Sequence, residues 1–390
     1  MRPAPVLAAG GRTVANLLSS TEWMLPSPAT QVHTVSVLPS HSPSFRHEFA
    51  FSNLAPSLRN GASGKGGGEL GSPRFHVVRD DLLHPLANGN KARKLDALLP
   101  LLRRRGATDI VRIDPRVFSS LGISLSRYVD NDRCSGYRTR NQAPYTDERR
   151  AAGCSDRVAG TNGTVMWADD VIIENLVVDE DSIDVNGSRR VVIVKEGAGS
   201  VQALLGVMRL VEYLSSLTLF GKDEKVHIVV DAGTGTTAVG LALGAVCLGL
   251  QWRVTAVMLA DTLERYEERE KALISDFKRL CHELYHEMVE DGSHDSLVQW
   301  VDRSSPRRFG KVLDGEIAMC REIAQQTGIL LDPMYTLAGW EQAVKLCRGD
   351  SETKVVMIHT GGTLGLFGLA QRYSLQFTTD ELRQSKGGQP

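Results

Sequence analysis

The chain has few cysteines, almost no net charge and no long apolar run, and each absence narrows its function. Its 390 residues include six scattered cysteines and no Cys-x-x-Cys motif, a pattern typical of reduced thiols rather than a disulfide framework. Lys+Arg (45) and Asp+Glu (46) nearly cancel, giving a formal net charge of −1. Because no overall basic field attracts nucleic acid or an anionic membrane, we expect a small-molecule function with no nucleic-acid partner.

The uncharged stretch from Ala232 to Trp252 is the candidate for a membrane span. Glycines and threonines interrupt it, and its apolar part, Ala238 to Leu250, is shorter than the roughly 20 residues that a span needs. We therefore predict a buried core helix and no membrane partner.

Acidic residues are nearly absent from the N-terminal region. Residues 1–47 contain only Glu22, together with several Ser, Thr and Pro. This composition fits an organelle transit peptide, which we place at residues 1–21, and predicts a mitochondrial location, with cytoplasm or plastid as alternatives. A disordered leader fits equally well.

From Arg74 onward, strand and helix patterns alternate, which predicts an α/β fold with a parallel sheet. The expected strands are 75–78, a strand beginning at 109, 191–194, 226–230 and 355–358. The expected helices are 91–104, 200–217, 264–283 and 314–326. Residues 58–72 are rich in Gly and Ser and predict a flexible loop. Residues 112–157 lose all periodicity, which is unusual for a loop inside a compact domain.

A dense cluster of cations follows a turn at residues 88–90. Asn88-Gly89-Asn90 is a strong turn signal, and Lys91 then opens a helix that buries leucines at helical spacing. The positive end of the helix dipole disfavours a protonated amine there, which suits a nucleophilic lysine. Charge alone favours the plainer interpretation, an exposed basic helix start.

A second segment, Val229 to Gly240, runs from a buried strand through a Gly/Thr turn into a helix. Glycines permit close backbone approach, and amide N–H groups converge at the positive helix end, so the segment can cradle a phosphate. By itself the pattern is also compatible with a dinucleotide site. It lacks Gly-Lys-Ser/Thr, which argues against a nucleotide P-loop.

Two further segments place polar residues at turns. Leu331 to Thr336 has the pattern of a proline turn after a short strand, where Tyr335 alone would be an ordinary aromatic. His359-Thr360-Gly361-Gly362 follows a strand, and a tight turn with positive φ accounts for its glycines.

In this order, the four segments resemble the motifs of the D-cysteine desulfhydrase and 1-aminocyclopropane-1-carboxylate (ACC) deaminase family, whose enzymes use pyridoxal 5′-phosphate (PLP). The resemblance covers about residues 23–111 and 157–377. It implies the tryptophan synthase β-like fold of PLP enzymes (fold type II), with two open parallel-sheet domains and the smaller one incomplete. We expect the larger domain at 22–104 and 217–390 and the smaller at 105–216, with 112–157 irregular or disordered.

The resemblance also assigns the site. Lys91 is the implied Schiff-base lysine, and Tyr335 the implied aromatic beside cofactor and substrate. The family's phosphate loop usually reads Gly-Thr-Gly-Gly-Thr, and here Thr236 replaces one glycine with a hydroxyl that can still serve phosphate. The implied cofactor-binding residues are Asn90, Lys91, Lys94, Gly233, Thr234, Gly235, Thr236, Thr237 and Thr336.

The residue after the tyrosine differs between the two activities of the family. It is Glu in the deaminases and commonly Thr in the desulfhydrases, so Thr336 favours α,β-elimination of D-cysteine to pyruvate, hydrogen sulfide and ammonia. The alternatives are ACC deamination and a non-catalytic PLP-binding isoform. A dinucleotide-dependent enzyme is less favoured, because no early strand-GxGxxG unit precedes a ribose-binding acid. We expect an amino acid substrate and a homodimer.

One motif suggests a different chemistry. His282-Glu283-Leu284-Tyr285-His286 matches HExxH, whose two histidines share a helix face and can bind zinc. It ends a charge-laced helix and lacks an obvious third ligand, so we predict a solvated helix end and no metal site. A zinc hydrolase stays a minor alternative.

The chain departs from the family after Val111. Family members carry there a Gly-Gly-x-x-Ser/Gln-Ser type loop that holds the substrate carboxylate and assists proton transfer, whereas this chain reads Arg-Ile-Asp-Pro-Arg at 112–116. No residue up to Arg157 replaces the loop, although Ser119 and Ser120 are the nearest hydroxyls. The segment resembles translated non-coding sequence or a splice product, which predicts impaired activity.

Overall fold

The computed structural model describes residues 7–39, 47–53, 72–84, 89–105, 109–112, 183–185, 189–194, 199–280, 296–350 and 352–377. The chain divides into two compact units, residues 1–100 with 197–390, and residues 101–196.

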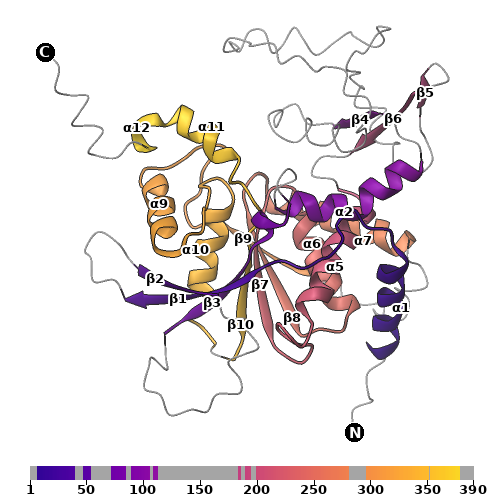
Figure 1. The fold of residues 1–390 in the computed structure, drawn as a ribbon, viewed down its shortest axis with the longest axis horizontal. Helices are drawn as coiled ribbons and strands as arrows, with labels where there is room; N and C mark the ends of the chain where they lie inside the picture. The colour runs from indigo at the N-terminus through magenta and orange to yellow at the C-terminus, as the bar shows by residue number, and fades with distance from the viewer. Residues whose placement is uncertain are drawn as a thin grey trace, which may run out of the picture. The chain divides into compact units, whose positions relative to one another are not determined.

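The larger unit contains a seven-stranded sheet (Figure 1). Its spatial order is β2 (His47–Ser52), β1 (Val32–Pro39), β3 (Arg74–Val78), β10 (Lys354–Ile358), β7 (Val226–Ala232), β8 (Trp252–Met258) and β9 (Val298–Asp302). In this spatial order, each pair of neighbours from β3 through β10, β7 and β8 to β9 is parallel. Strand β1 is antiparallel to both of its neighbours, β2 and β3. The predicted α/β fold with a parallel sheet is therefore confirmed.

Helices cover both faces of this sheet (Figure 1). The first face packs against α1 (Leu7–Ser20), α5 (Val201–Leu214), α6 (Thr236–Cys247) and α7 (Leu263–Leu280). The second packs against α9 (Glu316–Thr327) and α10 (Thr336–Leu346). Strand β7 contributes to both cores because its side chains alternate: Ile228 and Val230 join the first core, and Val229 the second.

Helix α6 is the predicted buried core helix. Almost all of its residues are buried, and its glycines let it approach α5 closely, since a Cβ at Gly240 would lie 2.8 Å from the Cβ of Val207. Within the described parts of the chain, no helix is both long and apolar enough to cross a membrane.

Four further helices lie wholly or mostly in the larger unit. They are the short 3₁₀ helix η2 (Asp80–Leu82), α2 (Asn90–Arg104), α11 (Gly365–Arg372) and α12 (Ser374–Phe377).

Two expectations for local structure need correction. Helix α5 ends at Leu214 rather than 217, because the Ser216 N–H donates to Tyr213 O, only three residues back, and the chain then turns with the Leu219 N–H donating to Ser216 O. The short strand expected before Asp332 is absent: Ile329 and Leu331 are buried in the core but belong to no strand. Their apolar character reflects burial without strand pairing.

The described part of the N-terminal segment contains the helix α1 over residues 7–20. Val14 and Leu18 of α1 are buried in the first core. The Trp23 indole N–H then donates to Leu18 O at 3.1 Å, and the Arg209 guanidinium lies 4.5 Å from the Trp23 ring centroid. These contacts attach the segment to the larger unit, and its role as a transit peptide stays a prediction.

The smaller unit shows a three-stranded sheet among its described residues. Strand β6 (Arg189–Val194) pairs in parallel with β4 (Asp109–Arg112) and antiparallel with β5 (Ile183–Val185). The strands expected at 109 and 191–194 are confirmed. Residues 113–182 lie outside the described residues, so the irregularity expected over 112–157 stays a prediction. The predicted boundaries also stay a prediction, although the compact units divide at 100/101 and 196/197 because α5 packs on α6.

Candidate active site

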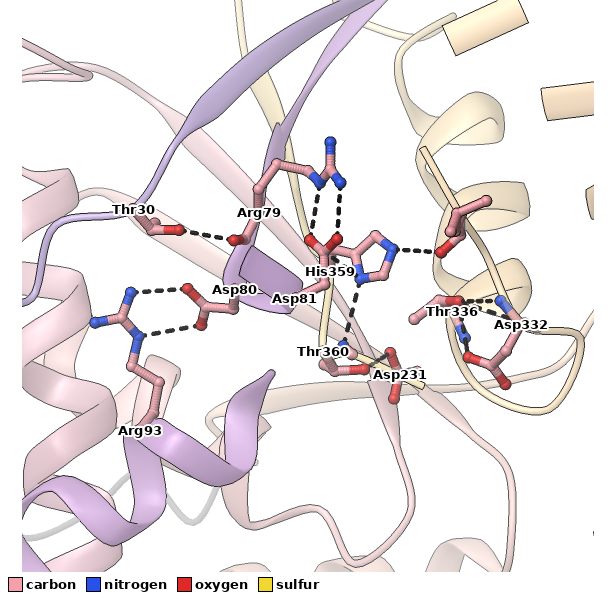
Figure 2. A network of polar contacts seen from close by, with 12 residues as sticks. Thr30, Arg79, Asp80, Asp81, Arg93, Asp231, Asp332, Thr336, His359 and Thr360 are labelled. Atoms are coloured by element: carbon pink, nitrogen blue, oxygen red, sulfur yellow. Dashed lines mark hydrogen bonds and ion pairs between the residues drawn. The ribbon is translucent and has the colours of Figure 1, made fainter. Parts of the chain in front are cut away.

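The four motif segments meet at one edge of the larger sheet. Strands β3, β10 and β7 are parallel neighbours, so their carboxyl ends lie at the same edge, where ligands commonly bind in open α/β sheets. The lysine segment follows β3, the His-Thr-Gly-Gly segment follows β10, and the glycine loop follows β7. Figure 2 shows polar contacts near these strand ends, among them the Arg93–Asp80 pair and the Thr360–Asp231 hydrogen bond.

The lysine helix is fixed at its first residue. The Asn90 N–H donates to Thr360 O at 3.0 Å. Gly89 has φ +69°, and a Cβ there would lie 1.8 Å from the same carbonyl, so only glycine fits. The Asn90 amide also donates to the Thr237 hydroxyl at 3.1 Å. These contacts hold the residues flanking Lys91 against both the His-Thr-Gly-Gly segment and the glycine loop.

The cations after Lys91 are not an exposed basic helix start, so that alternative is wrong. Arg93 is buried and binds Asp80 through two hydrogen bonds of 2.7 and 3.1 Å (Figure 2). Its third nitrogen donates to Pro28 O at 2.7 Å. Lys94 is buried as well, and Lys91 is half-buried. The two-pronged Arg93–Asp80 pair fixes the first turn of α2, because such geometry restricts both partners.

The glycine loop forms a cradle at the start of α6. Gly235 has φ +83° and precedes the helix, and a Cβ there would lie 2.8 Å from Trp300 Cη2. The Thr234 and Thr236 hydroxyls lie 3.2 Å apart. A Cβ at Gly233 would lie 3.5 Å from Tyr335 Cε1, which places the tyrosine ring beside the loop. The loop can therefore receive an anionic group at the helix N-terminus.

Asp332 organises the segment that carries Tyr335 and Thr336. Its Oδ1 accepts the N–H groups of Met334 (2.9 Å) and Tyr335 (2.8 Å). Its Oδ2 accepts the Thr336 N–H (3.2 Å) and hydroxyl (2.9 Å). The carboxylate thereby caps the start of α10. A Cβ at Gly362 would lie 2.1 Å from Asp332 Oδ2, so the second glycine of His-Thr-Gly-Gly is also required.

His359 is a buried, neutral support of its turn. Its Nε2 lies 3.0 Å from Leu330 O, and its Nδ1 accepts the Gly361 N–H at 3.3 Å, which assigns the tautomer protonated on Nε2. Burial lowers the pKa of His359, against the opposing effect of Asp81, whose carboxylate lies 3.6 Å from Nδ1. Asp81 in turn binds Arg79 through hydrogen bonds of 2.8 and 2.7 Å (Figure 2).

Asp231 is a site residue that the sequence reasoning did not identify. It is buried near the end of β7, where its carboxylate accepts the Thr360 hydroxyl at 2.5 Å. Burial raises the pKa of Asp231 to about 7; the Thr360 hydrogen bond lowers it, Asp332 raises it, and the charge of Lys91 lowers it. The only sequence signal was an acidic residue closing the apolar strand run Val226–Val230.

The structure brings most of the predicted site residues together. The lysine segment bonds directly to Thr237, and Tyr335 contacts the glycine loop, while Thr336 is engaged by Asp332. Their catalytic and cofactor-binding roles stay predictions. The HExxH residues 282–286 lie outside the described residues. Among the described residues, no group of three or more His, Cys, Asp or Glu side chains is placed to hold a metal ion.

Comparison with known proteins identifies the family. No family model matches the chain. A protein of rice (Oryza sativa subsp. japonica), named "Putative D-cysteine desulfhydrase 2, mitochondrial", is 66% identical over 416 aligned positions, covering 98% of this chain and all of the rice protein. The chain belongs to the D-cysteine desulfhydrase and ACC deaminase family. The family resemblance expected from the four motifs is thereby confirmed, and the rice protein's name agrees with the predicted mitochondrial location.

More distant relatives agree with this placement. A D-cysteine desulfhydrase of Yersinia enterocolitica is 24% identical over 75% of this chain and 88% of its own length. A crystal structure described as an ACC deaminase homologue superposes with a TM-score of 0.58 at 20% identity, covering 93% of this chain and 98% of that one. The latter likeness confirms the predicted fold type.

Proposed function

We propose that this chain is a PLP-dependent lyase that eliminates sulfide from D-cysteine, forming pyruvate, hydrogen sulfide and ammonia. Family membership supports the reaction class. The observation that carries the proposal is the hydrogen bond from the Asn90 amide to Thr237, because it joins the lysine helix directly to the glycine loop. PLP carries both an aldehyde and a phosphate. A site for it therefore needs a nucleophilic amine for the aldehyde, held close to a cradle for the phosphate.

The residues present fit PLP. The left-handed Gly235 turn, where a Cβ would clash with Trp300, starts α6 beside three threonine hydroxyls, so amide and hydroxyl groups gather at the positive end of a helix. Lys91 lies one residue inside α2, near enough for its charge to affect Asp231. When bound, PLP supplies an electron sink that makes the substrate Cα–H bond acidic.

The chain's own residues would perform the remaining tasks. Lys91 Nζ attaches the cofactor and then moves the substrate's Cα proton. The loop from Gly233 to Thr237 holds the phosphate, and Lys94 adds positive charge near it. Tyr335, beside Gly233, borders the reacting atoms. Thr336 would serve as a hydroxyl partner of the cofactor, for which it would have to give up its present donation to Asp332.

Deamination of ACC is the second candidate function, because the superposing crystal structure is described as an ACC deaminase homologue. Thr336 favours the desulfhydrase, since a hydroxyl stabilises a protonated pyridine nitrogen less than the carboxylate of a glutamate does and so leaves the ring a weaker electron sink. A non-catalytic PLP-binding protein is the third. The proposal includes a homodimer and a small amino acid substrate.

A comparison of substrates tests the proposal. The protein is loaded with PLP, both as it stands and with residues 112–157 replaced by the family's segment that carries the Gly-Gly-x-x-Ser/Gln-Ser loop. Sulfide and pyruvate are measured from D-cysteine and ammonia from ACC, with Lys91→Ala as the control. We expect Lys91-dependent sulfide release from the repaired chain. Ammonia from ACC without sulfide from D-cysteine would establish the deaminase, and bound PLP with neither product would establish the non-catalytic isoform.

A further inference from the structure

Two stacked aromatic rings pack against the glycine loop at Gly235. Tyr266 of α7 and Trp300 of β9 stack with their centroids 4.8 Å apart and their planes at 26°. A Cβ at Gly235 would meet Trp300 Cη2 at 2.8 Å and Tyr266 Cδ1 at 3.3 Å. The left-handed residue of the loop therefore rests on both rings, which have no part in the reaction proposed above.

The Tyr266 hydroxyl ties the loop to the neighbouring strand. Its single proton is shared between Ala232 O (2.7 Å) and Gly233 O (2.8 Å), and its oxygen accepts the N–H groups of Leu259 (3.3 Å) and Ala260 (3.2 Å). One fully buried phenol thus satisfies backbone groups at the ends of both β7 and β8. Burial raises the pKa of Tyr266, so the hydroxyl keeps the proton that it donates.

Trp300 is held in turn by Glu270. The indole N–H donates to Glu270 Oε2 at 2.7 Å, and the same carboxylate accepts the Ser296 hydroxyl at 2.6 Å and the Leu297 N–H at 2.7 Å. Glu270 lies four residues after Tyr266, on the same face of α7. One helix therefore supports both rings.

These contacts act on the amide groups that face a phosphate. A peptide unit is planar, so the carbonyl of one residue and the N–H of the next have a fixed relative direction. Holding Ala232 O fixes the Gly233 N–H, and holding Gly233 O fixes the Thr234 N–H. We infer that Tyr266, backed by Trp300, is a positioning residue that orients the cradle amides toward the cofactor phosphate. This inference rests on the proposed function.

The test compares binding of PLP with binding of pyridoxal, which lacks only the phosphate. Tyr266→Phe keeps the ring stack and removes the hydroxyl. We expect its affinity for PLP to fall at least about fivefold while its affinity for pyridoxal stays within about twofold, because only phosphate recognition loses its preorganised amides. The matched control is Tyr213→Phe, whose hydroxyl donates to Thr30 O at 3.2 Å outside the loop. This control should leave both affinities unchanged.

Trp300→Phe is the second variant, because phenylalanine lacks the distal ring atoms that lie against Gly235. This variant should also lower the ratio of the affinity for PLP to the affinity for pyridoxal. Trp252→Phe, at the start of β8, is its control and should not. Near-UV circular dichroism checks that each variant folds, and Trp300→Phe decides the matter if Tyr266→Phe does not fold.

Two outcomes would overturn the inference alone: an unchanged ratio in both loop variants, or an equal loss for PLP and pyridoxal. A wild-type protein that binds PLP no more tightly than pyridoxal would overturn the proposed phosphate cradle and this inference together.

Discussion

At the scale of single residues, Asp231 links the stability of the fold to pH. Burial raises its pKa to about 7 from an ordinary 3.8. Between these two values the native state keeps a proton that the unfolded chain releases, so the free energy of unfolding falls as pH rises from about 4 to about 7. At about 1.4 kcal/mol per pH unit, with the slope diminishing as the pH approaches the native pKa, the loss between pH 5 and pH 7 is roughly 2 kcal/mol.

Asp231→Asn should remove this pH dependence. The amide oxygen still accepts the Thr360 hydroxyl, but the side chain no longer titrates. Urea unfolding of the cofactor-free protein at pH 5 and pH 8 measures the effect. We expect the variant to gain stability relative to the wild type by roughly 3 kcal/mol on going from pH 5 to pH 8. A difference between the two proteins that does not change with pH would contradict the raised pKa of Asp231.

At the scale of elements, the turn that starts α6 combines an unusual backbone conformation with a close contact. Gly235 has φ +83° and lies against Trp300. Gly315 starts α9 with φ +86°, and a Cβ there would have no neighbouring atom within 4 Å. The two glycines thus share the conformational demand and differ in the contact.

Gly235→Ala should therefore weaken PLP binding, and Gly315→Ala should not. Both variants should lose about 1–2 kcal/mol of stability from the left-handed backbone. Only the first also pushes the loop away from Trp300, for which we expect at least a tenfold loss of PLP affinity, the equivalent of about 1.4 kcal/mol. Equal PLP affinity in the two variants, measured by absorbance titration, would show that the loop is not the cradle.

The elements that the sequence predicted are those with strong local patterns. The apolar run of β7 was sufficient to predict that strand, and the leucine spacing of α2 was sufficient to predict that helix. The glycine turn marked the start of α6. Strand β9 was not predicted, because apolar and polar residues alternate only weakly over Val298–Asp302. The segment is a strand because it pairs in parallel with β8. Ile329 and Leu331 were assigned to a strand because burial and strand pairing produce the same apolar signal.

In the candidate site, too, residues with a local sequence pattern were predicted, and residues that depend on long-range contacts were not. Local motifs identified Lys91 and the glycine loop, because turn glycines and helix starts are encoded by neighbouring residues. Asp231 and Tyr266 escaped notice because their partners are far along the chain: Asp231 meets Thr360, and the Tyr266 hydroxyl meets the end of β7. Such contacts exist only once the strands are ordered in the sheet.

At the scale of the whole molecule, the chain has fewer residues than there are positions in its alignment with the rice protein. The match with the rice protein spans 416 positions, whereas the chain has 390 residues, so the alignment contains internal gaps on this side. The chain also departs from the family's sequence pattern after Val111. A lyase needs groups that hold the substrate carboxylate so that the Cα–H bond is correctly aligned, and misplacing even one contact can cost on the order of a hundredfold in rate.

The 390-residue form should therefore release sulfide from D-cysteine poorly or not at all. Replacing residues 112–157 with the family's segment that carries the Gly-Gly-x-x-Ser/Gln-Ser loop should restore the reaction, and a sulfide assay on the two proteins at equal PLP occupancy measures the difference. Rapid sulfide release by the chain as it stands, abolished by Lys91→Ala, would show that the missing loop is dispensable.

The most direct test of the account is the identity of the lysine that carries the cofactor. The protein is incubated with PLP, reduced with borohydride and digested, and the labelled peptide is sequenced by mass spectrometry. We expect the label on Lys91, the residue that Asn90 and the buried Arg93–Asp80 pair hold beside the glycine loop. A label on Lys94 or Lys65, with Lys91 unmodified, would contradict the account.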